Sequence, residues 1–588
     1  MLRTEEQLTA FTPPDPRITR TSNAPPRSVR MRRSLRLFFF ALLLAPVSDV
    51  LAQHEGLLQI GDPVHRFLLE QQTAGHLPGA HLSHLPLSAY EARQYLDELD
   101  ARREDLTHRE RLDLDYYIGR IPHPLAAQIT KRIPFLYRES RSFYTFSGED
   151  FTFEVNPLLY LTYGRAAISD RDLGSSSVSV WQNTRGVRAA GHIGRHVFFE
   201  TRLEEVQRRD ARPLFVKRTS PRLPFTRYNA ETEVYDYQIA TGIAGLRTRH
   251  FEVRFGRDRN RWGPGIGSVL LSNFAPAYDQ LQIRTTVWRL QYTNLFAALT
   301  DLSPFPDDTY GDQILPRKYA AMHRLEINLP ARIQLGLFES IIFASDTTDE
   351  RRRSRFDISY LNPVIFYRAA EYDRGSPDNV LLGFDVAWTA LPGLRLYSQF
   401  MLDELVAGKI GRKSWVNKWG WLAGAHVVPR VPGLSVRAEY ARLRPYLYSH
   451  GRPVNAYVHF NDILGHPAGP NAEDFALFVD YRPKQRIETA LALAYTRRGR
   501  NTDALNYGSD PTLSYDTRVS DDGITLLQGV RQNLLLAEAR ATYELLPDLF
   551  LGGALIVHSI DDEIDGLDRF IAPTILLHWG LPFQSIRY

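Results

Sequence analysis

The chain has 588 residues, of which 44% are hydrophobic and 12% aromatic, and its mean hydropathy is −0.30. This composition is too polar for a helical membrane protein, and the lack of cysteine excludes a disulfide framework, a Cys-ligated zinc site and a thiol nucleophile. The formal charge of +4 comes entirely from residues 1–52, so no clustered basic face for nucleic acid is predicted.

The first predicted element is an export signal. A basic stretch, Arg30-Met31-Arg32-Arg33, precedes an apolar core at 37–47 and a small-residue cleavage site at Val50-Leu51-Ala52. The core is shorter than the about 20 apolar residues that a membrane-spanning helix needs, which favours a signal peptide over an anchor. We interpret residues 1–52 as leader and signal peptide, with Met31 as an alternative start.

Residues 53–130 are predicted to form a small periplasmic helical bundle. Asp62-Pro63 is a helix start, with an acidic N-cap and proline in the first turn. Ser88 with Glu91, and Thr107 with Glu110, form two capping boxes that each open a further helix. Three short amphipathic helices are expected to pack on one another or on the barrel's periplasmic end.

Residues 131–588 are predicted to form an outer-membrane β-barrel. In the clearest hairpin, around Leu391-Pro392-Gly393, Leu382, Phe384 and Trp388 share one face while Asp385 and Thr389 lie on the other. A soluble sandwich also alternates, but here the pattern recurs along the chain with nothing else to cover an apolar face. The fold class is therefore an all-β transmembrane barrel, apolar outside and polar inside.

The strands can be counted through short turns that contain proline, glycine or polar residues. With the strands at 151–163 and 571–588, they give about 18 antiparallel strands, with 16 as the alternative. The predicted turns are Gly194-Arg195-His196, 247–250, near Trp288, Pro330-Ala331-Arg332, 391–393, 429–433, Pro483-Lys484-Gln485 and Leu546-Pro547-Asp548. Long extracellular loops are expected at the opposite end, at 208–233, 257–279, 303–318, 346–356, 444–472, 501–524 and 560–569.

Several strands place charged side chains on the inward face. These charges either brace the wall or line a selective pore. They are Arg324, Glu326 and Asn328; Arg437 and Glu439; Glu488; and Glu538, Arg540 and Thr542.

Two loops carry candidate carbohydrate-binding residues, because aromatic faces and bidentate donors suit sugar rings and acidic groups. One block runs from Gly256 to Gly265 and offers Arg257, Asp258, Arg261 and Trp262. The alternatives are a plug or loop anchor for this block and packing at the upper aromatic girdle for the tyrosines. The second loop, 444–472, offers Tyr446, Tyr448, His450, Tyr457 and His459, and Tyr507, Asp510 and Tyr515 form a third group.

Several sequence blocks resemble one known family when they are taken in order. They are Asp62-Pro63-Val64, Pro86-Leu87-Ser88-Ala89-Tyr90-Glu91, Gly256-Arg257 with Arg261-Trp262-Gly263-Pro264-Gly265, Leu270-Leu271-Ser272-Asn273-Phe274-Ala275-Pro276, His323-Arg324-Leu325-Glu326, Tyr360-Leu361-Asn362-Pro363 and Asp378-Asn379-Val380-Leu381-Leu382-Gly383. Together they resemble the capsule-assembly Wzi family of outer-membrane barrels. The resemblance implies an 18-stranded barrel, a periplasmic helical bundle, a largely occluded lumen and a lectin-like role that holds capsular polysaccharide.

We therefore predict an outer-membrane surface protein that binds or retains capsular or extracellular polysaccharide in capsule assembly. The alternative is a sugar-specific or general porin. A hydrolase is disfavoured because the chain has no GxSxG and no HExxH motif. No enzymatic activity, cofactor or metal is expected, and the predicted partners are the polysaccharide and outer-membrane lipid, with a monomer as the expected state.

Overall fold

The computed structural model describes residues 56–121, 142–148, 150–170, 174–211, 227–302, 315–344, 356–364, 366–375 and 377–581. The predicted leader, the last seven residues of the strand predicted at 571–588 and most of the connections 208–233, 303–318 and 346–356 lie outside these residues.

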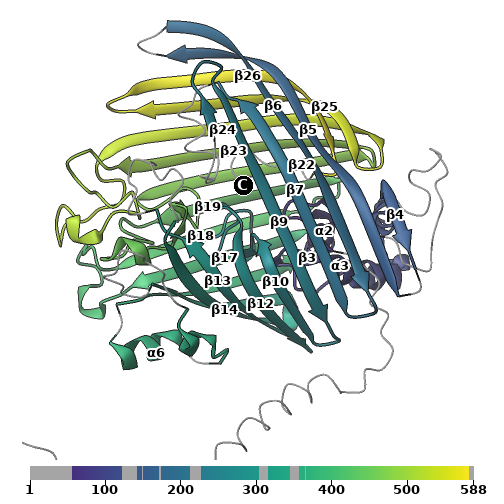
Figure 1. Ribbon diagram of the computed structural model, residues 1–588, viewed down its shortest axis with the longest axis horizontal. Coiled ribbons are helices and arrows are strands. Elements are labelled where there is room, and N and C mark those ends of the chain that lie inside the picture. Colours follow the sequence, from purple (N-terminus) through teal and green to yellow (C-terminus); the bar gives the residue numbers. More distant parts are fainter. Residues whose placement is uncertain are drawn as a thin grey trace, which may run out of the picture. The chain divides into compact units, whose positions relative to one another are not determined.

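Eighteen antiparallel strands close into a barrel (Figure 1). Each strand pairs with its neighbours along the chain, and the wall closes where the last strand pairs with the first, with Trp579 opposite Leu159. The predicted fold class and strand number are confirmed. In chain order the wall strands are β5 (Phe151–Asp170), β6 (Gly174–Ile193), β7 (Val197–Arg209), β9 (Val234–Arg247), β10 (Phe251–Asp258), β12 (Tyr278–Val287), β13 (Leu290–Thr300), β14 (Arg317–Leu329), β15 (Ile333–Phe343), β16 (Asn379–Leu391), β17 (Leu394–Glu404), β18 (Lys418–Val427), β19 (Leu434–Leu443), β22 (Ala472–Lys484), β23 (Ile487–Arg500), β24 (Val530–Leu546), β25 (Leu549–Asp562) and β26 (Gly566–Trp579).

All eight predicted short turns join strands at one end of the barrel, which we call the turn end; the other is the loop end. Local chemistry makes them tight: Gly393 has φ 87° and Ala331, after Pro330, has φ 60°. The prediction of a long connection at 560–569 is wrong. β25 ends at Asp562 and β26 begins at Gly566, so three residues suffice, and Gly566 adopts φ 82°.

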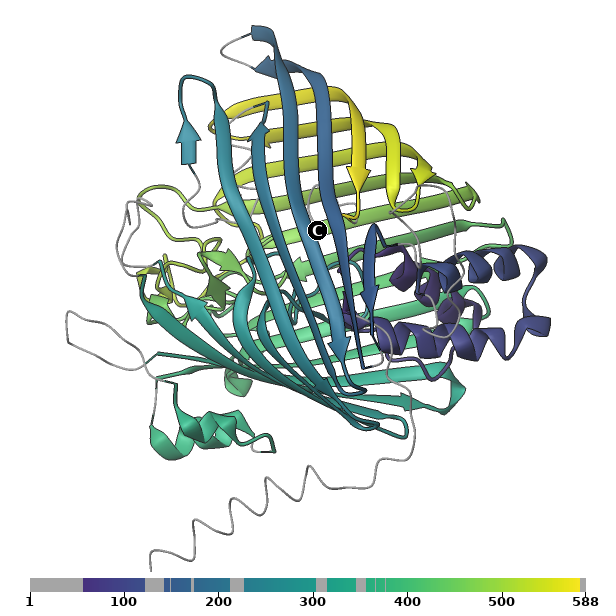
Figure 2. The same cartoon turned by 45° about the vertical axis from the view of Figure 1, so that its right-hand side comes forward.

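The wall is uneven in height. β5 and β6 have 20 residues each, whereas β12 and β18 have 10. The longer strands form a hairpin that extends past the end of its pairing with β7 at the loop end, where the last pair is Trp181 with Arg209, while β26 stays paired with β5 up to Asp170 (Figures 1 and 2).

The two faces of the wall differ as predicted. On β16, Phe384 and Trp388 are 49% and 45% exposed, whereas Asp385 and Thr389 between and beside them are buried. The predicted inward charges are confirmed as lumen groups, since Arg324 on β14 donates to both carboxylate oxygens of Asp385 at 3.0 and 2.8 Å. No helix of the described residues is long and apolar enough to cross a membrane.

Residues 56–121 form a helical module at the turn end (Figure 2). Each helix begins where the sequence predicts: Asp62 accepts from Val64 N, and both capping boxes are present. Phe67 stacks on Tyr117 with ring centroids 4.7 Å apart. Leu112 of the third helix is exposed. The helices are α2 (Pro63–Ala74), α3 (Ala89–Asp100) and α4 (His108–Arg120), with the 3-10 helix η2 (Arg103–Asp105).

The module is fixed to inward side chains of the wall by charged contacts. Arg66 bridges Asp480 and Glu488 at 3.0 Å each. From the wall side, Arg482 reaches Glu70 at 2.8 Å. These ion pairs are largely buried. Each charge therefore needs its partner, because a buried charge without one would be strongly destabilising.

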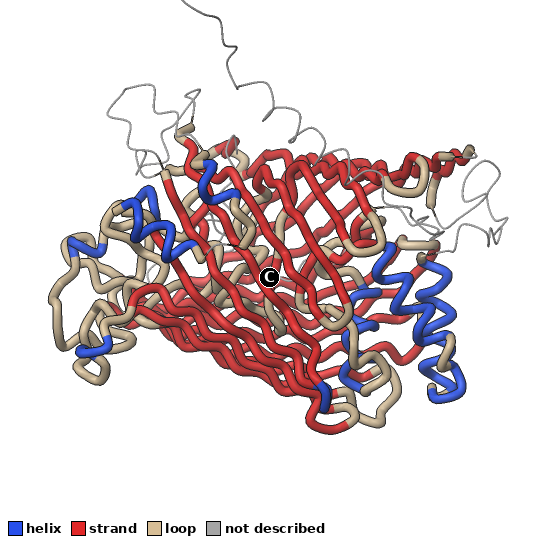
Figure 3. The backbone as a smooth tube through the Cα atoms, turned by 90° about the horizontal axis from the view of Figure 1, so that it is seen from below, coloured by secondary structure: helices blue, strands red, loops and turns tan. Residues whose placement is uncertain are grey.

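The remaining elements are short and lie in the connections and the module. They are β1 (Leu57–Leu58), β2 (His84–Leu85), β3 (Leu87–Ser88), β4 (Tyr144–Ser147), β8 (Arg227–Asn229), β11 (Arg261–Trp262), β20 (Val458–His459), β21 (Asp462–Ile463), α6 (Tyr367–Arg374), η3 (Pro330–Arg332), η4 (Ile358–Leu361), η5 (Ala407–Lys409), η6 (Pro453–Asn455) and η7 (Tyr515–Thr517). Loops gather at the end opposite the module (Figure 3).

Candidate functional site

The connection between β10 and β12, residues 259–277, leaves the loop end as predicted but folds into the lumen; we call it the plug loop. Its β11 pairs with β2 of the helical module, with Arg261 opposite Leu85 and Trp262 opposite His84. Gly263 N also donates to Ser83 O at 2.8 Å. Two segments that enter from opposite ends of the barrel therefore meet inside it.

A single buried carboxylate holds the plug loop to the wall. Glu439 on β19 accepts from Ile266 N, from Gly267 N at 2.9 Å and from Tyr397 Oη at 2.7 Å. Gln399 on β17 adds an acceptor for Val269 N at 3.0 Å. The inward polar residues of these strands therefore bind the backbone of the loop, which satisfies donors that would otherwise be buried without partners.

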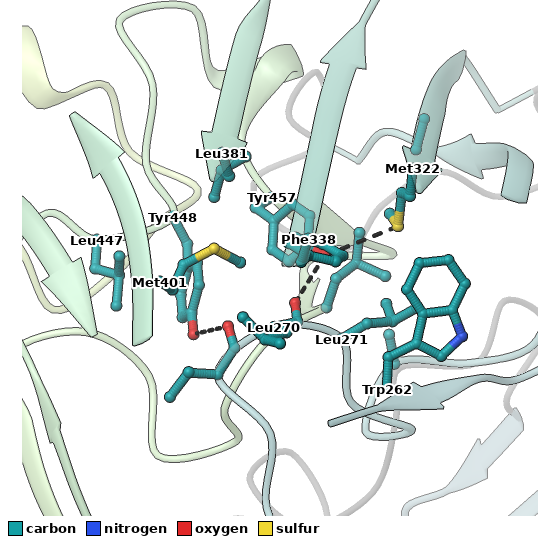
Figure 4. Close-up of a cluster of buried hydrophobic side chains, with 14 of the residues drawn as sticks. Trp262, Leu270, Leu271, Met322, Phe338, Leu381, Met401, Leu447, Tyr448 and Tyr457 are labelled. Carbon is teal, nitrogen blue, oxygen red and sulfur yellow. Dashed lines mark hydrogen bonds between the residues drawn. The ribbon is translucent and has the colours of Figure 1, made fainter. Parts of the chain in front are cut away.

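The connection between β19 and β22, residues 444–471, packs on the plug loop (Figure 4). Tyr448 and Tyr457 stack with ring centroids 5.7 Å apart. Their hydroxyls donate to the carbonyl oxygens of Val269 and Leu270 at 2.9 and 2.8 Å. Both rings are fully buried, so this connection is a second layer of the plug.

Most of the predicted carbohydrate-binding residues lie in this plug. Trp262, Tyr448, Tyr457 and His459 are almost completely buried. His459 Nδ1 accepts from the backbone N–H of Thr300 at 2.9 Å, and burial lowers the pKa of His459 to about 3, so the ring is neutral. Glycan contact by these four side chains stays a prediction, and the contacts that the structure gives them are internal.

The structure separates the other members of the first block. Arg257 and Asp279 form an exposed ion pair at 2.8 Å on the outer face of the wall. Asp258 faces inward and accepts from Arg259 N, and Arg261 donates to Ile266 O at 3.2 Å within the plug loop. The block therefore does not form one continuous surface.

Three loop-end connections meet in an aromatic cluster that we call the three-loop cluster: Trp415, Tyr446, His450, Tyr515 and Arg518. Trp415 lies 4.7 Å from the Tyr515 ring, and Arg518 lies 4.2 Å above the Trp415 ring. His450 meets Tyr515 edge-on at 5.7 Å, and Tyr446 meets Trp415 edge-on at 6.5 Å. These residues come from 405–417, 444–471 and 501–529, so the cluster exists only when the loops converge.

Backbone contacts fix the convergence of these loops. Trp415 N donates to Asp521 O at 3.1 Å, and Ser514 Oγ donates to Gly451 O at 2.7 Å. Tyr446 and Tyr448 both adopt positive φ, 66° and 70°, which is rare for bulky residues and turns neighbouring aromatic side chains to different places. Tyr446 thereby reaches the cluster while Tyr448 enters the plug.

The cluster combines neutral rings with charge at its edge. Burial raises the pKa of Tyr515 to about 12. Burial and the nearby Lys418 ammonium lower the pKa of His450 to about 4. Arg518 pairs with Asp521 at 2.5 Å and Asp516 at 3.5 Å, and both carboxylates are exposed. Flat apolar faces beside bidentate donors and acceptors are the chemistry that suits a sugar ring.

The sequence prediction found part of this cluster and missed the rest. Tyr446 and His450 were among the second group and Tyr515 in the third, but Trp415 and Arg518 were not singled out. The available signal for Trp415 is a lone tryptophan in a loop that also carries Lys409, Arg412 and Lys413. Among the described residues, no three His, Asp or Glu side chains are grouped so that they could hold a metal ion.

Comparison with known proteins gives a family. The model of the family described as "Capsule assembly protein Wzi" matches residues 171–562, more than half of the chain. No curated protein matches the sequence.

One solved structure shares the fold. The outer-membrane protein Wzi of Escherichia coli, described as involved in group 1 capsule assembly and as a carbohydrate-binding β-barrel, is 12% identical. The match covers 90% of this chain and 100% of that one, with a TM-score of 0.52. Weaker matches include OccK9 of Pseudomonas aeruginosa (12% identity, 72% and 98% covered, TM-score 0.39) and OccAB4 of Acinetobacter baumannii (9%, 74% and 98%, 0.38). The family match, joined to the closed barrel, means that this chain belongs to the capsule assembly protein Wzi family of outer-membrane proteins.

Proposed function

We propose that this barrel binds and retains capsular or extracellular polysaccharide at the cell surface, as a lectin-like and non-enzymatic part of capsule assembly. The observation that carries the proposal is the three-loop cluster, at the loop end of a barrel from a capsule assembly family. The loop end then faces the exterior, and the helical module lies in the periplasm. The carbohydrate binding described for Wzi of E. coli supports the same reading.

The ligand contacts follow from the exposure of the cluster. Trp415 and Tyr515 are half-buried, with Arg518 over the Trp415 ring and Lys418 over the Tyr515 ring, and the exposed parts of the two rings would contact the apolar side of a sugar. Arg518, with Asp516 and Asp521, offers hydrogen bonds to hydroxyl or acidic groups at the rim.

The predicted carbohydrate-binding residues then divide into direct and indirect roles. Tyr446 and His450 support the stacking rings from below. Trp262, Tyr448, Tyr457, His459, Asp258 and Arg261 act by keeping the loops in place, and Arg257 contacts ligand only from the outer rim.

The filled lumen favours retention over transport. The plug loop pairs with the helical module inside the barrel, and the second loop packs on both. A porin needs a continuous water-filled path, which the meeting of these segments obstructs. The alternative of a porin predicts steady single-channel conductance from the purified protein.

The test is migration of the purified barrel in gels that contain the polysaccharide of its own source cell. The wild-type protein is expected to be retarded, and Trp415→Ala and Tyr515→Ala are each expected to weaken binding about tenfold, the equivalent of about 1.4 kcal/mol. Trp288→Ala is the matched control, because Trp288 is a 77% exposed tryptophan at the turn end. Equal retardation of Trp415→Ala, Tyr515→Ala and the control would remove the cluster from the site, and no retardation of the wild type would refute the function.

A further inference from the structure

A row of polar side chains lies on the outer face of the wall. Asn294 on β13, His323 on β14 and Glu339 on β15 are directly opposite one another in register. His323 is the central residue of β14, and its Nε2 lies 2.8 Å from Glu339 Oε2. Their outward direction follows from strand alternation, because Met322 and Arg324 on either side of His323 belong to the lumen.

This row stands at the level of the apolar belt. Leu382, which pairs with Glu339, is 40% exposed on the same outer face. Leu337 and Phe384, one step toward the turn end, are 60% and 49% exposed. An uncovered ionisable pair at this level would contact lipid hydrocarbon, which is costly.

A segment of the β15–β16 connection covers the row. We call it the strap and define it as residues 356–364 and 366–375, with η4 and α6. The Tyr367 ring stacks on His323 at 4.5 Å, and Arg368 N donates to Glu339 Oε1 at 3.1 Å. Tyr292 Oη donates to Pro363 O. As a result Asn294, His323 and Glu339 are each at least nine-tenths buried although they point away from the lumen.

The strap is also held by contacts between aromatic rings and by a hydrogen bond from a tyrosine hydroxyl. The Tyr360 ring lies 4.7 Å from Phe343 of β15, and its hydroxyl donates to Asp378 at 2.7 Å. Phe356 meets Phe343 edge-on at 5.2 Å. The strap therefore packs on the outer face of β13–β15, and Figure 2 shows α6 outside the wall.

The exposed surface of the strap is apolar at three positions in η4 and near Pro363, whereas α6 carries the exposed Arg368 and Asp373. Ile358, Val364 and Phe366 are 78%, 81% and 74% exposed, which is more than any lipid-facing leucine of the neighbouring strands. Because the strap occupies the place where lipid would otherwise meet β13–β15, its outer side continues the lipid-facing surface of Leu337 and Phe384.

We infer that the strap is embedded in the membrane, where Ile358, Val364 and Phe366 contact the acyl chains of the surrounding lipid while the strap seals the polar row beneath. The partner of this surface is thus lipid hydrocarbon, and the strap is excluded from the extracellular loops. The inference is independent of polysaccharide binding.

The absence of cysteine makes the test direct, since single cysteines can carry a nitroxide label. Ile358→Cys and Phe366→Cys are labelled in the full-length exported protein and reconstituted in phospholipid vesicles. Leu337→Cys is the lipid-facing reference, and Asp522→Cys, in an exposed loop-end connection, is the aqueous reference. Collision rates with oxygen, which concentrates in hydrocarbon, and with a water-soluble nickel complex are measured for each label.

Both strap labels are expected to give the oxygen-to-nickel ratio of Leu337→Cys, several-fold above that of Asp522→Cys. A ratio equal to the aqueous reference at both sites would overturn the inference. Spin–spin broadening at Phe366→Cys that disappears on dilution with unlabelled protein would also overturn it, because a second copy would then cover the strap. The two labelled residues are both exposed and lie eight positions apart in the sequence. If one variant fails to fold, the oxygen-to-nickel ratio of the other still tests the inference.

Discussion

Replacement of Glu439 by glutamine tests how the plug loop is held. The Glu439 carboxylate is buried and accepts three hydrogen bonds, from Ile266 N, Gly267 N and Tyr397 Oη. Glutamine has nearly the same shape, but one of its two terminal atoms is an NH₂ that cannot accept. Whichever way the amide turns, at least one backbone N–H of the loop loses its acceptor.

The expected loss follows from these bonds. A hydrogen bond to a charged group contributes about 1.5–3 kcal/mol, and a buried donor left without a partner costs about 1–3 kcal/mol. These two ranges describe the same lost hydrogen bond and are not added together. We therefore expect Glu439→Gln to destabilise the closed state of the plug loop by about 3 kcal/mol, which raises its opening equilibrium constant about 100-fold.

Amide hydrogen exchange measures this equilibrium in the folded barrel. Peptides that cover 259–277 are expected to exchange about 100-fold faster in Glu439→Gln than in the wild type. Glu538→Gln is the matched control, because Glu538 is an inward carboxylate of β24 whose hydrogen bond goes to Arg540 at 3.1 Å. Identical exchange of 259–277 in Glu439→Gln and wild type would refute the role assigned to this carboxylate.

Three further predictions concern the helical module, with proteolysis of residues 56–121 as the measure of its stability. Ser88→Ala removes the capping box and is expected to cost about 1 kcal/mol. Phe67→Ala removes a ring that is 1% exposed and stacked on Tyr117, and is expected to cost about 3–5 kcal/mol; a smaller effect than that of Ser88→Ala would contradict the packing. Burial lowers the pKa of His65 from 6.5 to about 3, so between these values the unfolded state binds a proton that the folded module does not, and stability falls as the pH falls. His65→Gln should flatten this decline between pH 7 and pH 4, and an unchanged slope would exclude the imidazole as its source.

Local rules were enough to predict the wall. Strand faces follow from a period of two, and short turns from proline, glycine and polar residues, so the hairpin around Gly393 is readable without its neighbours. The capping boxes at Ser88 and Thr107 are equally local. The course of a loop is different, because it depends on surfaces that lie far away in the sequence.

The course of the connection 444–471 illustrates this limit. An aromatic loop such as the one with Tyr448 and Tyr457 has the same composition whether it binds sugar or fills a lumen. A signal was present in the wall: residues 295–299 of β13 are an unbroken apolar run, Leu295-Phe296-Ala297-Ala298-Leu299. Such a run indicates a strand covered on both faces, and here Leu295 packs under the plug and Phe296 under the strap.

The three-loop cluster was only partly predictable for a related reason. Trp415 and Tyr515 are one hundred positions apart and touch only because their loops meet above the barrel. Single-sequence reasoning identifies the residue types that suit a sugar, but it does not determine which of them share a surface.

The uneven wall has a consequence for how the protein stands at the cell surface. On the outer face of the long β5–β6 hairpin, Tyr163 lies opposite Trp181, and beyond them the outward positions of β5 are Arg165, Ala167 and Ser169, each opposite a serine of β6. Such an aromatic pair marks the upper border of the hydrocarbon layer. The seven residues from Gly164 to Asp170, about 23 Å of strand, therefore rise above that border as a fin along one side of the loop end. A polymer that lies on the cell surface would meet this stretch of β-sheet when it approaches the barrel from that side.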